Sequence, residues 1–399
     1  MTLQHALVLL TLVSVVADTM LLPFYPQFFA SAFGNPSPEH AGSYIAACCL
    51  TVMVALPFWA KVARSISEVP LWVMTQLAAA ILALAAFCTP TLVGFWIITQ
   101  VMLLFKASYL LIYPYAMRLA EKERHLGMAG LFTVLVHCGA IGGAVLGGWI
   151  LEFASPRVVY LVMAASDVLQ AGVCACMIRS HWIPWRQVLA RHTPQEPREQ
   201  GDLAKRGNPM IVHLGVVSLL FSLSGFVMRP FFAPWWATTS GRHSELLAGV
   251  VYAIPAWVAL VGLWLNRRAT KGCSSYAAIF QALILAMLGA AVQGIGQPMA
   301  IIAGRILYGW ALFRGTVHLE VLVFALSSRQ HYAMDFSRIN IFQNVGVLLA
   351  SSAAGFVVSG FGLRMPFVAA LGGFAVTWLV FVIMFGRRLW PSLARLPSA

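Results

Sequence analysis

Nine ionisable side chains lie inside long apolar runs of the sequence, and these are the residues whose types suit chemistry in an apolar environment. They are Asp18, Lys106, His137, Asp167, Arg229, Arg305, Arg314, His318 and Glu320. A charge near the centre of a lipid bilayer costs about 3 kcal/mol on insertion scales, so each of them needs a partner or a function. Carboxylates in such places take up and release protons, and basic side chains bind anionic groups.

The elements that position these residues are predicted to be membrane-spanning helices. Hydrophobic residues make up 60% of the 399 residues, charged residues make up 10%, and the mean hydropathy is +0.82. A water-soluble domain of this length does not carry such a composition. Apolar runs of about 20 residues match a helix that crosses a hydrocarbon layer of about 30 Å. The composition predicts an all-α integral membrane protein and excludes a soluble enzyme or a nucleic-acid-binding module.

Twelve apolar runs are separated by polar residues, proline or glycine, six on each side of a polar stretch from Arg179 to Pro209. The twelve transmembrane helices are predicted near residues 6–30, 41–62, 70–89, 93–117, 127–151, 157–178, 210–234, 246–265, 274–293, 298–326, 337–359 and 365–386. The predicted domains are a six-helix bundle at 1–178, a cytoplasmic linker at 179–209, and a second six-helix bundle with a short cytoplasmic tail at 210–399.

The two halves carry related segments. Asp18 to Phe29 reads DTMLLPFYPQFF, and Arg229 to Trp236 reads RPFFAPWW. Pro23 and Pro230 are equivalent, and each copy places an aromatic pair after its prolines. A repeat at half the chain length indicates duplication of a large unit, whereas solenoid repeats recur every 20–50 residues or so. Two homologous bundles are therefore predicted.

The basic residues follow the membrane. Of the 26 Lys and Arg residues, 19 lie in one alternating set of connections together with the polar stretch and the C-terminal tail, and three lie in the other set. The positive-inside rule therefore places both termini in the cytoplasm, and an even number of spans agrees with this. The first apolar run contains Asp18, and no small-residue cleavage site precedes the next run, so we expect it to be retained as the first helix. These features fit a bacterial inner membrane.

Several motifs resemble the major facilitator superfamily of secondary transporters, and the resemblance covers essentially the whole chain. In the fifth run, the glycines at 139, 143, 147 and 148 match the antiporter motif G-x-x-x-G-P-x-x-G-G, with Ala144 in place of its proline. Pro23 and Pro26 match a P-x-x-P pattern that is similar to twelve-helix drug:proton antiporters. A glycine face allows close approach of a neighbouring helix. The resemblance implies an exporter, although an ordinary small-residue packing seam also explains the glycines.

Other positions depart from the family pattern. The loop after the second run has Arg64 where the family usually has aspartate, with an acid at Glu68 instead, whereas the loop after the eighth run retains Asn266 and Arg267. These four residues are gate candidates. In the fourth run, Gln100 stands where the antiporters usually have arginine, and the arginine-to-glycine pattern appears in the tenth run at Arg305.

Asp18 is the first candidate for proton coupling, because it precedes the proline-containing part of the first run, which lines the cavity in the proteins that this chain resembles. The alternative is a structural carboxylate paired with a basic residue such as Lys106. Asp167 and Glu320 are further candidates.

The predicted substrate cavity contains basic and aromatic residues. At about 100° per residue, Arg314 and His318 share one helix face, and Arg305 lies nearly opposite Arg314. The cavity candidates are Tyr25, Lys106, Tyr109, Tyr113, Arg305, Arg314 and His318, of which the members in the fourth run share a face. This composition favours an anionic or zwitterionic substrate. His137 and His318 lack a ligand partner at metal-binding spacing, and so do the seven cysteines. No metal and no cofactor is therefore predicted.

Three function classes compete. The first is a proton-coupled antiporter that exports a small organic molecule, such as a drug, a metabolite or a siderophore, acting as a monomer. The second is a proton-coupled symporter that imports a nutrient or an organic anion. The third, a membrane enzyme, lacks a catalytic constellation, and the sequence has no nucleotide-binding motif for a primary pump.

Overall fold

The computed structural model describes residues 3–63, 65–119, 125–180, 209–266, 274–327 and 331–389. Regular structure among these residues is helical throughout. Eleven helical segments are long and apolar enough to span a membrane, and a shorter apolar helix, His5–Thr19, supplies one more. The predicted fold class, an all-α protein with twelve transmembrane helices, is confirmed.

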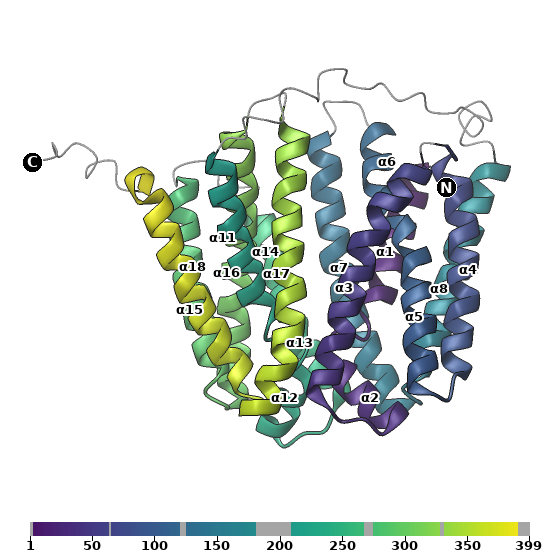
Figure 1. Ribbon diagram of the computed structural model, residues 1–399, viewed down its shortest axis with the longest axis horizontal. Helices are drawn as coiled ribbons and strands as arrows, with labels where there is room; N and C mark the ends of the chain where they lie inside the picture. Colours follow the sequence, from purple (N-terminus) through teal and green to yellow (C-terminus); the bar gives the residue numbers. More distant parts are fainter. Residues whose placement is uncertain are drawn as a thin grey trace, which may run out of the picture. The chain divides into compact units, whose positions relative to one another are not determined.

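Contacts between residues divide the chain into two compact units, whose helices are shown in Figure 1. Unit 1 comprises Met1–Ser37, Ala47–Pro197 and Ser244–Ala253, and unit 2 comprises Pro38–Ala46, Arg198–His243 and Ile254–Ala399. Two short segments thus belong to the unit that is formed mainly by the other half of the sequence. The predicted boundaries at 178 and 210 stay a prediction, and residues 181–208 of the predicted linker lie outside the described residues.

Unit 1 contains most of the first six predicted spans. Its elements are α1 (Leu3–Thr19), α2 (Tyr25–Phe33), most of α3 (Pro38–Val62), α4 (Glu68–Cys88), α5 (Leu92–Lys106), the 3₁₀ helix η1 (Ala107–Leu111), α6 (Ile112–Leu119), α7 (His125–Phe153), α8 (Val158–Arg179) and α13 (Glu245–Tyr252).

Unit 2 contains most of the last six predicted spans. Its elements are the first turns of α3, then α11 (Pro209–Phe226), α12 (Phe232–Ser240), α14 (Ile254–Asn266), α15 (Ser275–Gln293), α16 (Pro298–Leu326), α17 (Tyr332–Phe361) and α18 (Met365–Leu389).

Two helices that the sequence predicts as continuous are broken at the repeated prolines. The prediction of one helix over 6–30 is wrong, because α1 ends at Thr19 and α2 begins at Tyr25. Likewise α11 ends at Phe226 and α12 begins at Phe232. A proline lacks a backbone N–H and its ring clashes with the carbonyl four residues earlier. For Pro23 and Pro230 those carbonyls belong to the last residues of α1 and α11, which explains where both helices end.

The fourth predicted span is also irregular. The α-helix α5 ends at Lys106, five residues follow as a 3₁₀ helix, and α6 then begins. Pro114 lies in α6, and the carbonyl four residues before it belongs to Leu110, inside η1. The same steric effect therefore explains the loss of α-helical hydrogen bonding at η1. The predicted eighth span is divided as well, into α13 and α14, just before Pro255.

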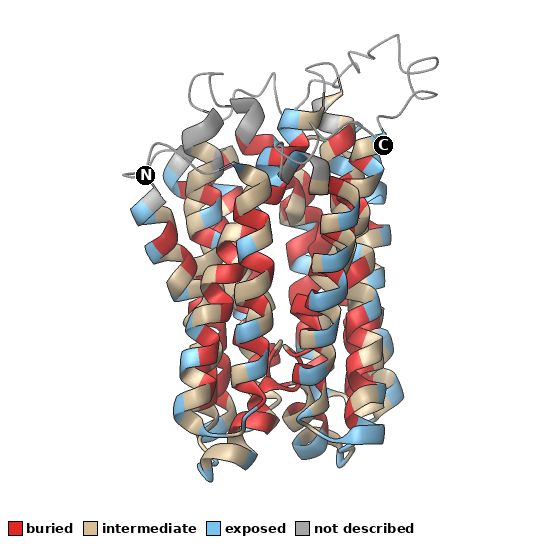
Figure 2. Cartoon of the chain, turned by 90° about the vertical axis from the view of Figure 1, so that its left-hand side faces the viewer, coloured by how far each residue is buried: buried red, intermediate tan, exposed pale blue. Residues whose placement is uncertain are grey.

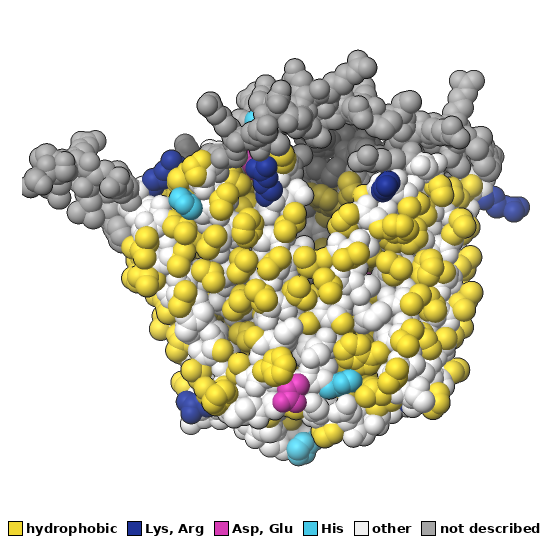
Figure 3. Space-filling model, in the orientation of Figure 1, with side chains coloured by type: hydrophobic (Ala, Val, Ile, Leu, Met, Phe, Trp, Pro, Cys, Tyr) yellow, Lys and Arg dark blue, Asp and Glu magenta, His cyan; other side chains and the backbone are white. Residues whose placement is uncertain are grey.

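The outer surface of the helices fits a lipid environment. Figure 2 shows buried residues along one face of the helices and exposed residues along another. Many exposed side chains are large and apolar, such as Met299, Ile383 and Val93. In the view of Figure 3, hydrophobic side chains cover the middle of the face, and charged side chains lie near its upper and lower edges.

The glycine face of α7 lies against two other helices of unit 1. A Cβ atom added at Gly139 or Gly143 would overlap side chains of α1, and one added at Gly147 would overlap the backbone of Met20 just after α1. Gly148 faces the backbone of Glu245 in α13. Glu152, one turn further, accepts hydrogen bonds from the Ser244 hydroxyl at 2.7 Å and from the Leu246 N–H at 2.9 Å. The glycines therefore allow α7 to pack closely against α1 and α13.

This close approach gives the first testable prediction. Replacing Gly147 by alanine places a methyl group against the main chain of Met20, which cannot rotate away as a side chain can. We expect the melting temperature of the purified protein in detergent to fall by roughly 5 °C.

The matched control is Gly172→Ala in α8, where an added Cβ has no described atom within 4 Å. Because alanine favours a helix more than glycine does, this variant should unfold at the same temperature or slightly higher. Equal melting temperatures for both variants would contradict the packing described here.

Candidate functional site

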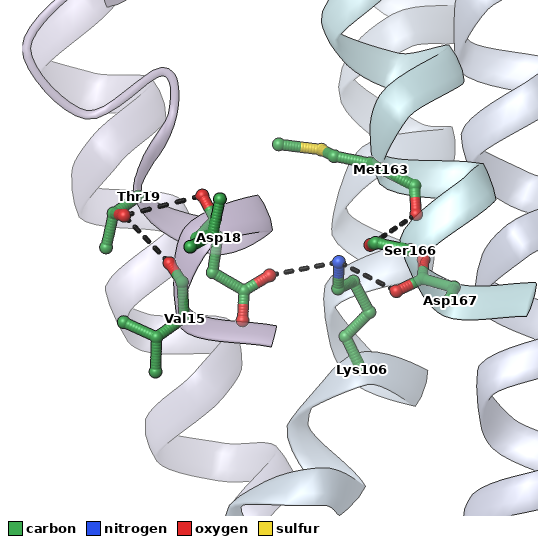
Figure 4. A network of polar contacts seen from close by, with 8 residues as sticks. Val15, Asp18, Thr19, Lys106, Met163, Ser166 and Asp167 are labelled. Atoms are coloured by element: carbon green, nitrogen blue, oxygen red, sulfur yellow. Dashed lines mark hydrogen bonds and ion pairs between the residues drawn. The ribbon is translucent and has the colours of Figure 1, made fainter. Parts of the chain in front are cut away.

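The centre of unit 1 holds a triad of charged side chains in which one lysine joins two carboxylates. The Nζ atom of Lys106 lies 3.0 Å from Oδ1 of Asp18 and 3.1 Å from Oδ1 of Asp167 (Figure 4). Asp18 lies in the last turn of α1, Lys106 is the last residue of α5, and Asp167 is in the middle of α8. Three different spans therefore meet at one ionic site, which we call the triad.

The triad is positioned between two apolar regions of unit 1. On one side, the rings of Phe28 in α2, Phe95 in α5 and Tyr160 in α8 pack together, with centroid distances between 5.2 and 5.8 Å. On the other side, a buried apolar core includes residues from α1, α3, α4, η1, α6 and α8, among them Trp59 and Trp72. Lys106 and Asp167 thus lie between apolar layers, and water is largely excluded from them.

The three side chains differ in exposure. The Lys106 side chain is 3% exposed, that of Asp167 is fully buried, and that of Asp18 is 29% exposed. If both carboxylates are ionised, the triad carries one net negative charge. The second oxygen of Asp167, Oδ2, is buried and receives no hydrogen bond from any described residue. A buried unpaired carboxylate oxygen is unfavourable, so this arrangement is suited to binding one proton.

Further polar groups extend the triad through the core of unit 1. Tyr109 follows Lys106 by three residues in the chain. It also lines a small cavity with Gln76 of α4 and Gln170 of α8, which has room for about one water molecule. Gln76 and Gln170 are almost completely buried, and their amide nitrogens have no hydrogen-bond partner among the described residues. The accessible wall of this cavity is apolar, so the two buried amides lie beside it and do not face into it.

The equivalent place in unit 2 is occupied by uncharged residues among those that the structure describes. Gly225, which is 207 residues after Asp18, lies at the end of α11, and its carbonyl accepts a hydrogen bond from the Tyr308 hydroxyl of α16 at 2.5 Å. The Tyr308 ring packs against Phe374 of α18, with centroids 6.3 Å apart. Tyrosine and phenylalanine thus fill the junction of the three corresponding helices. The fold does not require an ionic triad at this junction.

The sequence comparison decides the family. Residues 7–316 match the family model described as Major Facilitator Superfamily. The chain belongs to this superfamily. It is therefore a multi-pass membrane transporter with a small-molecule substrate, and not an enzyme.

Solved structures agree with this fold. The nucleoside transporter NupG has a TM-score of 0.77 at 14% identity, with 96% of this chain and 99% of that chain covered. The human organic anion transporter MFSD10 has a TM-score of 0.68 at 15% identity, with 94% and 98% covered. A bacterial homologue of the iron transporter ferroportin, in an inward-facing state, has a TM-score of 0.72 at 14% identity, with 96% and 99% covered. At these identities the likeness shows the fold alone. No curated protein matches the sequence.

The remaining candidates in unit 1 of this transporter have aromatic partners. Tyr25 stacks with Phe29 within α2. Tyr113 is 41% exposed and packs against Phe132 of α7, so it does not join Lys106 and Tyr109. The predicted common helix face is wrong for Tyr113, because the 3₁₀ segment changes the rotation per residue between them.

Two further polar residues of unit 1 have specific environments. Gln100 accepts a hydrogen bond from Thr51 of α3 at 2.6 Å. Glu68, a predicted gate residue, is buried at the start of α4. The other gate candidates Arg64 and Arg267, and the side chain of Asn266, lie outside the described residues.

In unit 2 of the transporter, the charged residues of α16 point to different neighbours. The Arg305 guanidinium is buried over the Phe232 ring of α12, 4.3 Å from its centroid. Arg314 donates a 3.4 Å hydrogen bond to Gln281, and His318 lies 3.3 Å from the Ser275 hydroxyl, both on α15. Glu320 is exposed. As the spacing predicts, α16 does not bring all its charges to one place.

Sequence reasoning found each member of the triad but did not bring all three together. It considered a pair between Asp18 and Lys106 and treated Asp167 separately. Charge balance was an available signal, because Lys106 is the only Lys or Arg in the first six predicted spans that does not lie at a span end, while two aspartates lie there. It also missed Gln76 and Gln170, because isolated glutamines in apolar runs carry no spacing signal.

The triad gives a second prediction. Lys106→Met leaves Asp167 buried without its cationic partner, which costs about 3–5 kcal/mol when a buried pair loses one member. We expect a large fall in melting temperature, measured on the purified protein. Lys61→Met, at an exposed lysine of α3, is the matched control and should unfold close to the parent temperature.

A neutral triad distinguishes charge from packing. The triple variant Asp18→Asn, Lys106→Gln, Asp167→Asn removes all three charges and leaves none unpaired. Its melting temperature should recover most of what Lys106→Met loses. If Lys106→Met unfolds no earlier than Lys61→Met, the ionic description of this centre is wrong.

Proposed function

We propose that this transporter is a proton-coupled antiporter that exports a small organic molecule, and that the triad carries the proton. The observation that carries the proposal is the position of Lys106, shared between Asp18 and Asp167 at 3.0 and 3.1 Å. One cation balances only one of the two carboxylates. The site therefore has two natural charge states, one with a net negative charge and one neutral after protonation.

These two states suit coupled transport. Asp167 is fully buried and has a carboxylate oxygen without a hydrogen bond from the described residues, whereas Asp18 is partly exposed. A proton on either carboxylate neutralises the triad, and a cationic substrate group near Asp18 does the same. Proton and substrate then compete for one negative charge, and this competition is the elementary requirement of antiport.

Buried polar residues next to the triad support proton access. Gln170 is three residues from Asp167 on α8, and Tyr109 is three residues from Lys106. Both residues line the cavity with Gln76. Their buried polar groups would let a proton approach the triad past hydrogen-bonding side chains and not only through the apolar core.

The direction of transport is inferred from α7. Its glycines at 139, 143, 147 and 148 lie against neighbouring helices and match the spacing that resembles exporters of this superfamily. The distribution of Lys and Arg supports a bacterial inner-membrane location with both termini in the cytoplasm. One chain carries both bundles, which supports a monomer as the transporting species.

The substrate proposed here is a zwitterion or an anion that also carries a cationic group. Lys106 is engaged by two carboxylates, so it is not available to bind a wholly anionic molecule. A cationic group fits beside Asp18, and the basic residues of α16 support an anionic group elsewhere in the substrate. Siderophores that contain both an amine and carboxylate groups have this combination of charges.

A symporter that imports a nutrient or an organic anion is the alternative. The same triad would serve it, because protonation of the triad would then accompany substrate binding and not oppose it. The glycine spacing of α7 favours the exporter.

The third prediction tests coupling and direction together. In inverted membrane vesicles with an acidic interior, we expect uptake of a labelled zwitterionic compound from a panel that also contains cationic dyes and anionic chelators. Uptake should stop when an uncoupler removes the proton gradient. Uptake in right-side-out vesicles alone would replace the exporter with the symporter, and indifference to the gradient in both would remove proton coupling.

The fourth prediction assigns the proton site. Asp167→Asn leaves Lys106 with Asp18 and keeps the triad neutral, as protonation would. In proteoliposomes we expect gradient-driven transport to fall by about tenfold or more, while exchange of labelled for unlabelled substrate without a gradient continues. Glu320→Gln, at an exposed carboxylate of α16, should change neither activity. Full gradient dependence in Asp167→Asn would exclude this carboxylate as the proton carrier.

A further inference from the structure

The helix that carries Lys106 changes from α-helical to 3₁₀ geometry directly after this residue. The last α-helical residue of α5 is Lys106, and η1 begins at the next residue. The corresponding helix of unit 2, α16, runs without interruption from Pro298 to Leu326. The irregular turn is therefore a property of this span and not of the repeated fold, and it coincides with the triad.

Two tryptophans of neighbouring helices bind main-chain carbonyls on either side of the junction. The indole Nε1 of Trp59 in α3 donates to the carbonyl of Leu104 at 2.6 Å. The indole Nε1 of Trp72 in α4 donates to the carbonyl of Ser108 at 3.1 Å. Lys106 lies between these two anchored residues. The Ser108 hydroxyl is also 2.6 Å from the hydroxyl of Thr75 in α4.

The packing of the two indole rings fixes them in place. Trp59 packs against Phe105, with centroids 6.1 Å apart, and Trp72 packs edge-on against Tyr115 at 5.3 Å. Both tryptophans belong to the buried core that includes Ala107, Leu111 and Ile112. An indole is a rigid donor with no acceptor atom, so it binds a carbonyl without offering the backbone an alternative hydrogen bond.

These contacts determine where the lysine ammonium group lies. In a 3₁₀ turn the hydrogen bonds run to the third residue and the geometry is poorer than in an α-helix, so carbonyls at its boundary accept an outside donor readily. If the 3₁₀ turn became α-helical, the residues on its two sides would rotate and shift relative to each other. Lys106 must reach Asp18 on α1 and Asp167 on α8 at the same time, which leaves little tolerance for such a shift.

We propose that Trp59 and Trp72 are positioning residues of the transporter, which hold the α5–η1 junction in the conformation that places Lys106 between Asp18 and Asp167. Their indole N–H groups act on the main chain at Leu104 and Ser108, two residues before and two residues after the lysine. This inference rests on the proposed function for its effect on transport, whereas the positioning itself does not depend on which ion is coupled.

The first test is a double-mutant cycle in thermal unfolding of the purified protein. The double variant Trp59→Phe, Trp72→Phe removes both donors and keeps aromatic rings in the core. It is made in the parent and in the neutral triad described above. We expect its melting temperature to fall further in the parent, by roughly 3 °C or more, because only the parent has ion pairs that depend on the position of Lys106.

An equal fall in both backgrounds would show that the indoles support only the backbone, and it would overturn the proposal. Trp149→Phe is the matched control, because Trp149 is a half-exposed tryptophan on α7 of the same unit. It should have the same small effect in both backgrounds. This cycle needs no substrate, so it decides the positioning even if proton coupling fails.

The second test separates coupling from folding in proteoliposomes. Trp59→Phe, Trp72→Phe should reduce gradient-driven transport by about tenfold and reduce exchange without a gradient by less than about threefold. Equal losses in both assays would indicate a merely structural role and contradict the inference. If the parent protein itself ignores the proton gradient, the proposed function fails, and the unfolding cycle alone decides whether the tryptophans position Lys106.

Discussion

The sharing of one buried ammonium group by two carboxylates is the interaction on which the interior of unit 1 depends. Removing three ionisable groups from water is unfavourable, and their mutual attraction compensates for it only when the geometry is close. Distances of 3.0 and 3.1 Å satisfy that condition for Lys106. The condition ties α1, α5 and α8 together at one depth, because each helix contributes a residue that is stable there only beside the other two.

The corresponding junction in unit 2 shows that the fold can be completed without this interaction. Gene duplication leaves two bundles with related breaks, at Pro23 and at Pro230, and with related helix junctions behind them. In unit 2 the junction is closed by Tyr308 and Phe374 around the carbonyl of Gly225. Since aromatic packing completes the fold there, the charges in unit 1 are retained against a stability cost. Buried charges that the fold does not need are characteristic of ion and substrate pathways in membrane proteins.

Because water is largely excluded from the bundle, backbone groups around the triad are satisfied by protein groups. Hydrogen bonds from indoles to backbone carbonyls replace those that water would supply to an irregular helix in a soluble protein. The glycines of α7 remove side chains where α1 and α13 approach, so that these helices pack through their backbones. Gln76 and Gln170 are the exception, since their amide nitrogens are buried near the triad without a hydrogen-bond partner among the described residues. Polar groups in this bundle thus lie where a proton or a helix break requires them.

The sequence alone determined that the helices span a lipid bilayer, how many spans there are, that the two halves are related, and which family the chain belongs to. Apolar runs of membrane-spanning length and repeated motifs are local properties of the chain. It also identified Asp18, Lys106 and Asp167 individually, since any charge in an apolar run is conspicuous. Tertiary structure decided that these three residues meet, that the first and seventh spans are broken, and that Trp59 and Trp72 anchor the fourth. Helical periodicity gives the face on which a residue lies but not the neighbour on that face. The pairing of Lys106 with both aspartates depends on a 3₁₀ turn and on the packing of three separate spans, which no spacing within one span encodes.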